Sequence, residues 1–183
     1  MKPFPKRLKL ADLPTRIEKL ERFSERTGLN VYVKRDDMSG MEWSGNKIRK
    51  LEFSIQEALD RGADTLITCG GIQSNHCRAT AAAAARLGLR SCLLLRTDDP
   101  DPLLDGNYFI DKVLGADIRF ISAEDYRSRR GEVMEELAGE FERQGHKAYI
   151  IPEGASNGIG TFGYLSCMQE ILQQEKEMGV QFD

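Results

Sequence analysis

The 183-residue sequence predicts an α/β fold, built on an open, parallel, twisted sheet with helices on both faces. Three observations lead to this prediction. From residue 46 onward, amphipathic stretches typical of helices alternate with short apolar segments typical of buried strands. Loops rich in glycine and small polar residues follow several of these strand-like segments. The length allows one ordinary domain or two small ones.

The first part of the chain is expected to hold a helix, a strand and a loop. Residues 13–27 carry apolar side chains three positions apart and are followed by Gly28, which predicts a short amphipathic helix. Residues 29–36 alternate and are rich in valine and tyrosine, which predicts a strand, and residues 37–45 are expected to form a loop. A second helix should start at Asn46 and stop at Gly62.

The remaining elements follow a regular order. Residues 97–106, rich in aspartate and proline, indicate a surface loop, and Ser122 resembles the cap of a long charged helix. Residues 180–182 look like the beginning of a further strand. Strands are expected at 65–69, 91–95, 118–121 and 148–151, and helices at 76–87, 107–114, 123–143 and 161–177.

The composition argues against several classes of partner. The net charge is −3 with both signs interspersed, so neither nucleic acid nor a membrane is expected as a partner. The four cysteines form no C-x-x-C pair and only two histidines are present, so no metal site is expected. No leader peptide and no stretch of ~20 apolar residues is apparent. These features favour a reducing, cytoplasmic setting, with an organelle left open.

Lys47 stands at the expected start of the second helix, directly after a Gly-Asn turn. The partial positive charge at a helix N-terminus favours the free amine that attacks carbonyl groups. Lys47 is therefore a candidate Schiff-base nucleophile, and carbonyl chemistry becomes the leading hypothesis. The alternative interpretation is a solvated surface charge, because lysine is rarely buried.

The loop at residues 70–76 follows a predicted strand and opens a helix, which is where open parallel sheets bind ligands. Gln73, Ser74, Asn75 and His76 offer side-chain groups beside free backbone N–H groups, an arrangement suited to a carboxylate or phosphate. The alternative is an ordinary helix cap. His76 is either a proton carrier or a structural donor. The loop lacks a nucleotide-binding motif, which weakens the case for a Rossmann dehydrogenase.

Two further loops leave alternatives open. The aspartates within residues 97–106 lack the spacing of a calcium loop, which favours a solvated loop over a cation site. Residues 153–160 either cap a substrate site or join two structural units. The sequence does not decide whether Tyr164, in the helix that follows, faces the site or the core.

Three blocks, in this order and at these separations, carry a family resemblance: SGNKIRKLE, TCGGIQSNHCRATAAAAARLGL and IPEGASNGIGTFGY. Together they resemble the pyridoxal-phosphate enzymes of the D-cysteine desulfhydrase and aminocyclopropane-carboxylate deaminase family. The similarity extends from about Leu13 to Glu170. The run QSNH followed by CRATA is closer to the desulfhydrases, because the deaminases commonly have glutamine where His76 stands.

The resemblance implies roles for five residues. Lys47 matches the lysine that forms the Schiff base with pyridoxal phosphate and shuttles the substrate's alpha proton. Asn75 matches the asparagine that hydrogen-bonds the cofactor's ring hydroxyl, and Asn46 belongs to the same cofactor site by shaping the turn of the lysine. Ser74 and His76 fall, with Asn75 between them, where the family holds the substrate carboxylate.

The resemblance also implies the tryptophan-synthase-beta-like fold, known as fold type II, in which a small domain is inserted into a large one. Residues 51–156 would form the small α/β domain, residues 1–50 the N-terminal part of the large domain, and residues 157–183 the start of its remainder. The family's glycine-rich phosphate loop lies beyond the third block and is not present. The large domain is therefore expected to be incomplete.

The implied reaction is beta-elimination of D-cysteine to pyruvate, ammonia and sulfide. Deamination of aminocyclopropane-carboxylate, or lyase action on another sulfur amino acid such as cysteate, is the alternative within the class. Outside it stand a non-catalytic fragment or small-molecule-binding module and, ranked last, a nucleotide-binding protein. The expected partner is an amino acid substrate, and a full-length protein would be a homodimer.

Overall fold

The computed structural model describes residues 4–183. Its larger sheet is parallel and four-stranded, in the order β5-β4-β3-β6. In its centre, Ile67 of β3 pairs with Cys92 of β4 on one side and with Ile150 of β6 on the other. The predicted parallel sheet is thus confirmed. Its strands are β3 (Thr65–Gly71), β4 (Arg90–Arg96), β5 (Asp117–Ile121) and β6 (Ala148–Ile150).

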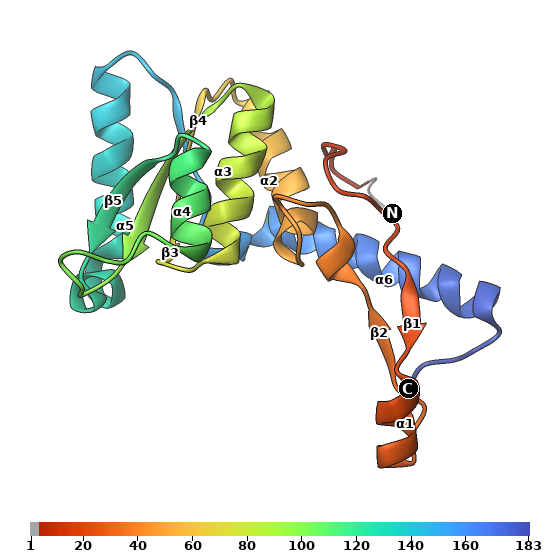
Figure 1. Cartoon of the computed structure of the whole chain (residues 1–183). Coiled ribbons are helices and arrows are strands. Elements are labelled where there is room, and N and C mark those ends of the chain that lie inside the picture. The colour runs from red at the N-terminus through yellow and green to blue at the C-terminus, as the bar shows by residue number, and fades with distance from the viewer. Residues whose placement is uncertain (1–3) are drawn as a thin grey trace.

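Helices cover both faces of this sheet, as the sequence predicts (Figure 1). Side chains alternate along a strand, so Leu66 and Ile67 of β3 enter different cores. Leu66 packs with α2 and α3, whereas Ile67 packs with α5. A third group of buried side chains joins β4 to α3 and α4. The helices are α2 (Lys47–Asp60), α3 (Asn75–Leu87), α4 (Gly106–Val113) and α5 (Ala123–Arg143).

The predicted helix over residues 13–27 is wrong in its first half. Residues 17–19 form β1 (Ile17–Lys19), which pairs antiparallel with β2 (Tyr32–Lys34), and only α1 (Glu21–Thr27) between them is helical. Arg35 forms an ion pair with Glu18 across this hairpin. Pairing with a partner fifteen residues away overrides the local helical pattern, which carries no information about that partner. The predicted strand at 29–36 shortens for the same reason and ends before a 3-10 turn, η1 (Asp36–Met38).

The last helix, α6 (Gly158–Met178), begins three residues earlier than predicted because the Asn157 side chain caps it by accepting from the backbone N–H of Gly160. The strand expected from Val180 does not form. The Phe182 ring instead packs edge-on against Tyr32, with ring centroids 5.2 Å apart. The residues after α6 therefore pack against the hairpin by a side-chain contact instead of pairing as a strand.

A buried cluster of charges joins the hairpin, α2 and α6. The Arg49 side chain is 1% exposed and makes paired hydrogen bonds of 2.8–3.0 Å to Asp36 and to Glu170. Lys34 lies 3.0 Å from Glu170. Burial alone would raise the pKa of Glu170, but the hydrogen bonds from Arg49 and Lys34 hold it below its usual value. Because Gly163 of α6 packs directly on the Arg49 carbonyl, the helix that starts with Lys47 is firmly anchored.

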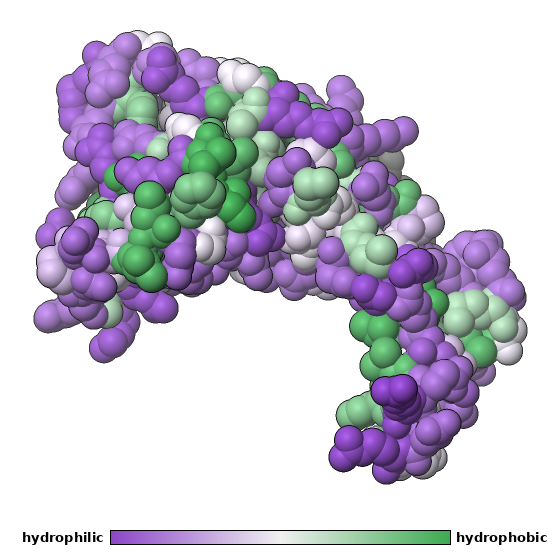
Figure 2. All heavy atoms as spheres, in the orientation of Figure 1, coloured by the Kyte–Doolittle hydropathy of each residue, from purple (hydrophilic) through white to green (hydrophobic). Residues whose placement is uncertain are grey.

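The hairpin projects from one end of the molecule as an arm, and a broad hollow separates it from the sheet and its helices (Figures 1 and 2). Apolar side chains gather at the surface over α4, where Leu103, Phe109 and Val113 are exposed (Figure 2). No helix within residues 4–183 is long and apolar enough to cross a membrane.

Candidate active site

Lys47 is the first residue of α2 and follows Asn46, as the sequence predicts. The half-buried side chain donates a hydrogen bond from Nζ to Asn46 Oδ1, at 2.9 Å. Its stem packs against η2 (Glu153–Ala155), the turn that follows β6, because a Cβ built on Gly154 would lie 3.4 Å from Lys47 Cε. The Lys47 amine therefore lies between its own turn and the loop after β6.

A second lysine stands beside the first. Lys50 Nζ donates to Ser156 Oγ at 2.9 Å, on the same turn that contacts Lys47. Burial, followed by the positive charge of Lys47, lowers the pKa of Lys50. This corner of the molecule is therefore positively charged.

The loop after β3 presents a helix N-terminus. Ser74 caps α3 by accepting from the backbone N–H of Cys77 at 3.2 Å, an approach that the absence of a Cβ on Gly70 permits. The capping interpretation is therefore correct, and it leaves other donors available. In the part of the chain that the structure describes, the backbone N–H groups of Asn75 and His76 have no hydrogen-bond partner. Together with the helix dipole, they suit a carboxylate.

The His76 ring is buried beneath this loop, at 4% exposure. Its Nε2 lies 2.8 Å from Thr68 Oγ1, and the Thr68 hydroxyl donates to the Ile151 carbonyl at 2.7 Å. The hydroxyl proton is thus engaged, which makes His76 Nε2 the donor to Thr68. Burial, and then the charges of Lys47 and Lys50, lower the pKa of His76 to about 4. The ring is therefore neutral near pH 7 and fastens α3 to the sheet.

Asn75 is exposed and belongs to a network that the sequence did not indicate. Its Oδ1 accepts from Arg78 Nη1 at 3.0 Å and from Asn107 Nδ2 at 2.9 Å. Arg78 lies within the second sequence block, in the run CRATA, but nothing in the sequence joined it to Asn75 or to Asn107. Gly154 and Ser156 lie in a loop whose role the sequence left open, and the structure places both next to the two lysines.

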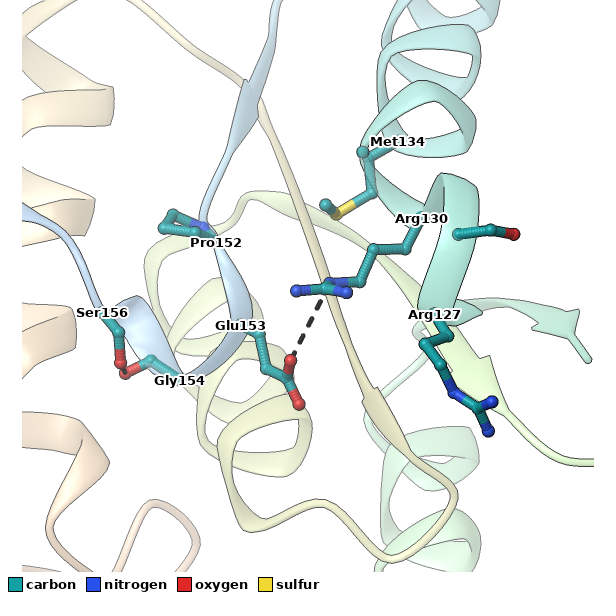
Figure 3. Close-up of a pocket in the computed structure, with 9 residues that line it drawn as sticks. Arg127, Arg130, Met134, Pro152, Glu153, Gly154 and Ser156 are labelled. Carbon is teal, nitrogen blue, oxygen red and sulfur yellow. Dashed lines mark hydrogen bonds and ion pairs between the residues drawn. The ribbon is translucent and has the colours of Figure 1, made fainter. Parts of the chain in front are cut away.

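A cavity of about 650 Å³ opens on the other side of that turn, against the first turns of α5. Figure 3 shows Arg130 extending from α5 toward Glu153, with 3.9 Å between their charged groups. Pro152, Gly154 and Ser156 line the same cavity.

The carboxyl ends of β3 and β6 therefore bring together an amine at one helix start and N–H donors at another. Such a site, in an open parallel sheet, is typical of α/β proteins whose ligands are small and anionic, and it places a lysine where a carbonyl group of such a ligand would lie within reach. The chain belongs to the family of pyridoxal-phosphate dependent enzymes, which matches residues 8–183. The family resemblance seen in the sequence is confirmed, and the cofactor of this family is pyridoxal phosphate.

Individual relatives are similar over nearly the whole chain. A mitochondrial bifunctional D-cysteine desulfhydrase/1-aminocyclopropane-1-carboxylate deaminase of Arabidopsis thaliana is 47% identical over 180 residues, which cover 95% of this chain and 45% of the relative. A D-cysteine desulfhydrase of Serratia proteamaculans is 42% identical, covering 98% of this chain and 54% of the relative. The crystal structure of an ACC deaminase homologue superposes with a TM-score of 0.85 at 42% identity, covering 93% and 51%. This confirms the predicted fold class, and the chain spans about half the length of these relatives.

The residues present fit the cofactor of the family. Pyridoxal phosphate carries an aldehyde, a ring oxygen and an anionic group. Lys47 has an amine, hydrogen-bonded to Asn46, that suits the aldehyde. The Asn75 side chain has amide N–H groups without a hydrogen-bond partner among residues 4–183, and these suit the ring oxygen.

Proposed function

We propose that this chain supplies the lysine-bearing part of a pyridoxal-phosphate-dependent lyase that converts D-cysteine to pyruvate, ammonia and sulfide by beta-elimination. One observation carries the proposal: the Lys47 amine lies at the carboxyl ends of the strands, where the start of α3 has backbone N–H groups without a hydrogen-bond partner among the described residues. The names of relatives that include D-cysteine desulfhydrase support the choice of substrate.

Two residues hold the cofactor and a third shapes the turn. When bound, pyridoxal phosphate supplies an electron sink for the carbanion formed next to its ring. Lys47 Nζ would hold the cofactor's aldehyde carbon, and the same amine would take the substrate's alpha proton. Asn46 orients that amine through the 2.9 Å hydrogen bond from Nζ. Asn75 would donate from its amide to the ring oxygen.

The start of α3 holds the substrate carboxylate. The hydroxyl of Ser74 and the backbone N–H groups of Asn75 and His76 are the donors, and the helix dipole adds to their attraction. His76 contributes to this site through its backbone, because its ring is engaged with Thr68. The buried ring keeps the loop in place.

Another substrate is the alternative within this class. Deamination of aminocyclopropane-carboxylate, or lyase action on a different sulfur amino acid, uses the same lysine, and the relatives' names include the deaminase. Sulfide released from D-cysteine, compared with ammonia released from aminocyclopropane-carboxylate, separates the two. A non-catalytic binding module would release neither product.

The test of the proposal is covalent capture of the cofactor. Pyridoxal phosphate added to the chain should produce an absorbance band that Lys47→Ala abolishes and that Lys112→Ala, an exposed lysine on α4, leaves unchanged. Borohydride trapping followed by peptide mass analysis should place the cofactor on Lys47. A chain that shows no Lys47-dependent band lacks the proposed role, and reversible binding without a band indicates a binding module.

We also propose the domain division, in which residues 51–156 form the small domain and the flanking residues belong to the large one. The four-stranded sheet, which lies within 65–150, supports the small domain as a unit. Its lower boundary falls inside α2, which is continuous from Lys47 and packs on both α3 and α6. Limited proteolysis should therefore spare residue 51, which lies inside this continuous helix. The first cut is expected near residue 156, at the other end of the proposed small domain.

The proposal also covers the oligomeric state of the protein and its location in the cell. The exposed apolar side chains over α4 support a homodimer of the complete protein, which Val113→Lys should weaken in light scattering. Four free, buried cysteines support a reducing cytoplasm. The mitochondrial relative of Arabidopsis thaliana keeps an organelle as the alternative.

A further inference from the structure

Arg78, on α3, ties together three segments that meet at the site. Its Nε donates to the carbonyl of Glu42 at 2.9 Å, and its Nη2 donates to the carbonyl of Ser44 at 3.0 Å. Its Nη1 donates to the side-chain oxygens of Asn75 at 3.0 Å and of Asn107 at 2.8 Å. The planar guanidinium therefore fixes the turn that precedes α2, the start of α3 and the start of α4 relative to one another.

The neighbouring amides each have a defined orientation. The backbone N–H of Asn107 donates to Gln73 Oε1 at 2.8 Å, and Gln73 Nε2 donates to Asp105 Oδ1 at 2.8 Å. Asn107 Nδ2 donates to the Gln73 carbonyl at 2.8 Å and to Asn75 Oδ1 at 2.9 Å. A backbone N–H only donates and a carbonyl only accepts, so flipping any of these amides would lose hydrogen bonds.

The network decides which end of the Asn75 amide is available to a ligand. Both Arg78 and Asn107 donate to Oδ1, and within residues 4–183 Asn75 Nδ2 has no hydrogen-bond partner. We propose that Arg78 is a positioning residue that, with Asn107, turns the N–H donors of Asn75 toward the cofactor and sets the spacing between Asn75 and the Lys47 turn. This inference rests on the proposed function, because it assigns Asn75 the cofactor's ring oxygen as acceptor.

The geometry of Arg78, rather than its charge, is the property that matters. A lysine carries the same charge as a compact ammonium with three donors, which cannot span Glu42, Ser44, Asn75 and Asn107 at once. Arg78→Lys should therefore behave like Arg78→Met. Arg90→Met is the matched control, because Arg90 is an exposed arginine at the opposite, amino-terminal end of β4.

The first experiment measures hydrogen exchange of the backbone amides without any cofactor. In Arg78→Met and Arg78→Lys, the hydrogen-bonded amides of Gly45 before α2 and of Ser74 and Cys77 at the start of α3 should exchange at least tenfold faster. The amides of β3 and β4 should exchange as in the wild type. Asn107→Ala should speed exchange at Ser74 and Cys77 but not at Gly45, because the bonds from Arg78 to Glu42 and Ser44 remain. If Arg78→Met speeds exchange throughout the chain, the other two variants provide the test. Arg78→Lys should speed exchange both before α2 and at the start of α3, whereas Asn107→Ala should speed it only at the start of α3.

The second experiment tests the orientation of the Asn75 amide. Asn75→Asp keeps the acceptor for Arg78, now as a charge-assisted pair, but removes the N–H donors. Its hydrogen exchange should match the wild type, while pyridoxal phosphate trapped on Lys47 with borohydride, relative to Lys50, should fall about tenfold. A merely structural role for Asn75 would leave that ratio unchanged.

The two experiments fail separately. Wild-type exchange in both Arg78 variants, or full recovery of exchange and labelling in Arg78→Lys, overturns the positioning role. Unchanged labelling in Asn75→Asp overturns the orientation of the amide. If the wild-type chain itself shows no preference for Lys47 over Lys50, the proposed function fails, and hydrogen exchange still decides whether Arg78 joins the loops.

Discussion

The buried His76 ring should make the chain unstable in mild acid. Its pKa is about 4 in the folded chain against an ordinary value of 6.5, because burial and the charges of Lys47 and Lys50 disfavour the protonated ring. As the pH falls below 6.5, the His76 ring takes up a proton in the unfolded chain but stays neutral in the folded chain. The free energy of unfolding therefore decreases between pH 6.5 and pH 4. At about 1.4 kcal/mol for each pH unit, this amounts to ~3 kcal/mol by pH 4.

Urea unfolding of the wild type and of His76→Gln, at pH 7 and at pH 4, measures this contribution. Glutamine keeps a donor for Thr68 but does not titrate, so the stability of the variant relative to the wild type should improve by ~3 kcal/mol at the lower pH. His146→Gln is the matched control, because His146 is the other histidine and has 24% of its side chain exposed beside Asp64.

The wild-type resonances of His76 provide an independent measurement. Its ring should titrate near pH 4 in the folded chain. A His76 ring that titrates near 6.5, or a difference between wild type and His76→Gln that is the same at pH 7 and pH 4, would refute the reasoning. Either result would also reopen the ring of His76 to a role in binding the substrate.

Three further predictions concern stability. Burial raises the pKa of Asp111 from 3.8 to about 7, and its carboxylate oxygens lack partners among residues 4–183. The stability of Asp111→Asn relative to the wild type, measured by urea unfolding, should therefore grow by ~4 kcal/mol from pH 4 to pH 8. A difference that stays constant with pH would contradict this. Glu170→Gln should cost about 3 kcal/mol at pH 7 by breaking the pair with Arg49. The loss should be smaller at pH 3, because the pKa of Glu170 is lowered in the folded chain, so below its ordinary value of 4.5 the unfolded wild type gains a proton more readily than the folded one; equal losses would contradict this. Gly163→Ala should cost ~2 kcal/mol in a thermal melt, since its Cβ would lie 2.4 Å from the Arg49 carbonyl oxygen, whereas Gly131→Ala, in open space on α5, should stabilise by up to ~1 kcal/mol.

The order of the elements after residue 46 followed from the sequence because local patterns encode it. Each buried strand reads as a short apolar run, and each helix carries its own cap or stop signal, such as Ser74 or Gly88 for α3. The hairpin of β1 and β2 was missed because its stability comes from pairing across the chain. No local spacing reports that Ile17 will lie opposite Lys34.

The residues of the site likewise fall into those that local sequence patterns predicted and those that only the folded chain revealed. Lys47 and the loop at 73–76 were found from their positions at helix starts, which are local properties. The network around Arg78 was not, because it depends on three segments that meet only in the folded chain. The direction of the His76 ring was equally hidden, since a histidine at a helix start can face either the ligand or the sheet.

The sequence by itself determined the alternation of strands and helices, the lysine at the head of α2 and, through three ordered blocks, the family. These are encoded by periodicity and by short motifs that act within a few residues. Only the tertiary structure decided that Gly154 packs on Lys47, that the His76 ring points to the sheet, and that the side-chain oxygen of Asn75 accepts from Arg78 and Asn107. Each of these depends on a contact with a segment far along the chain, namely Lys47 with Gly154, Thr68 with Ile151 beneath His76, and Asn75 with Asn107. Burial and hydrogen-bond geometry there choose among orientations that the sequence leaves equal.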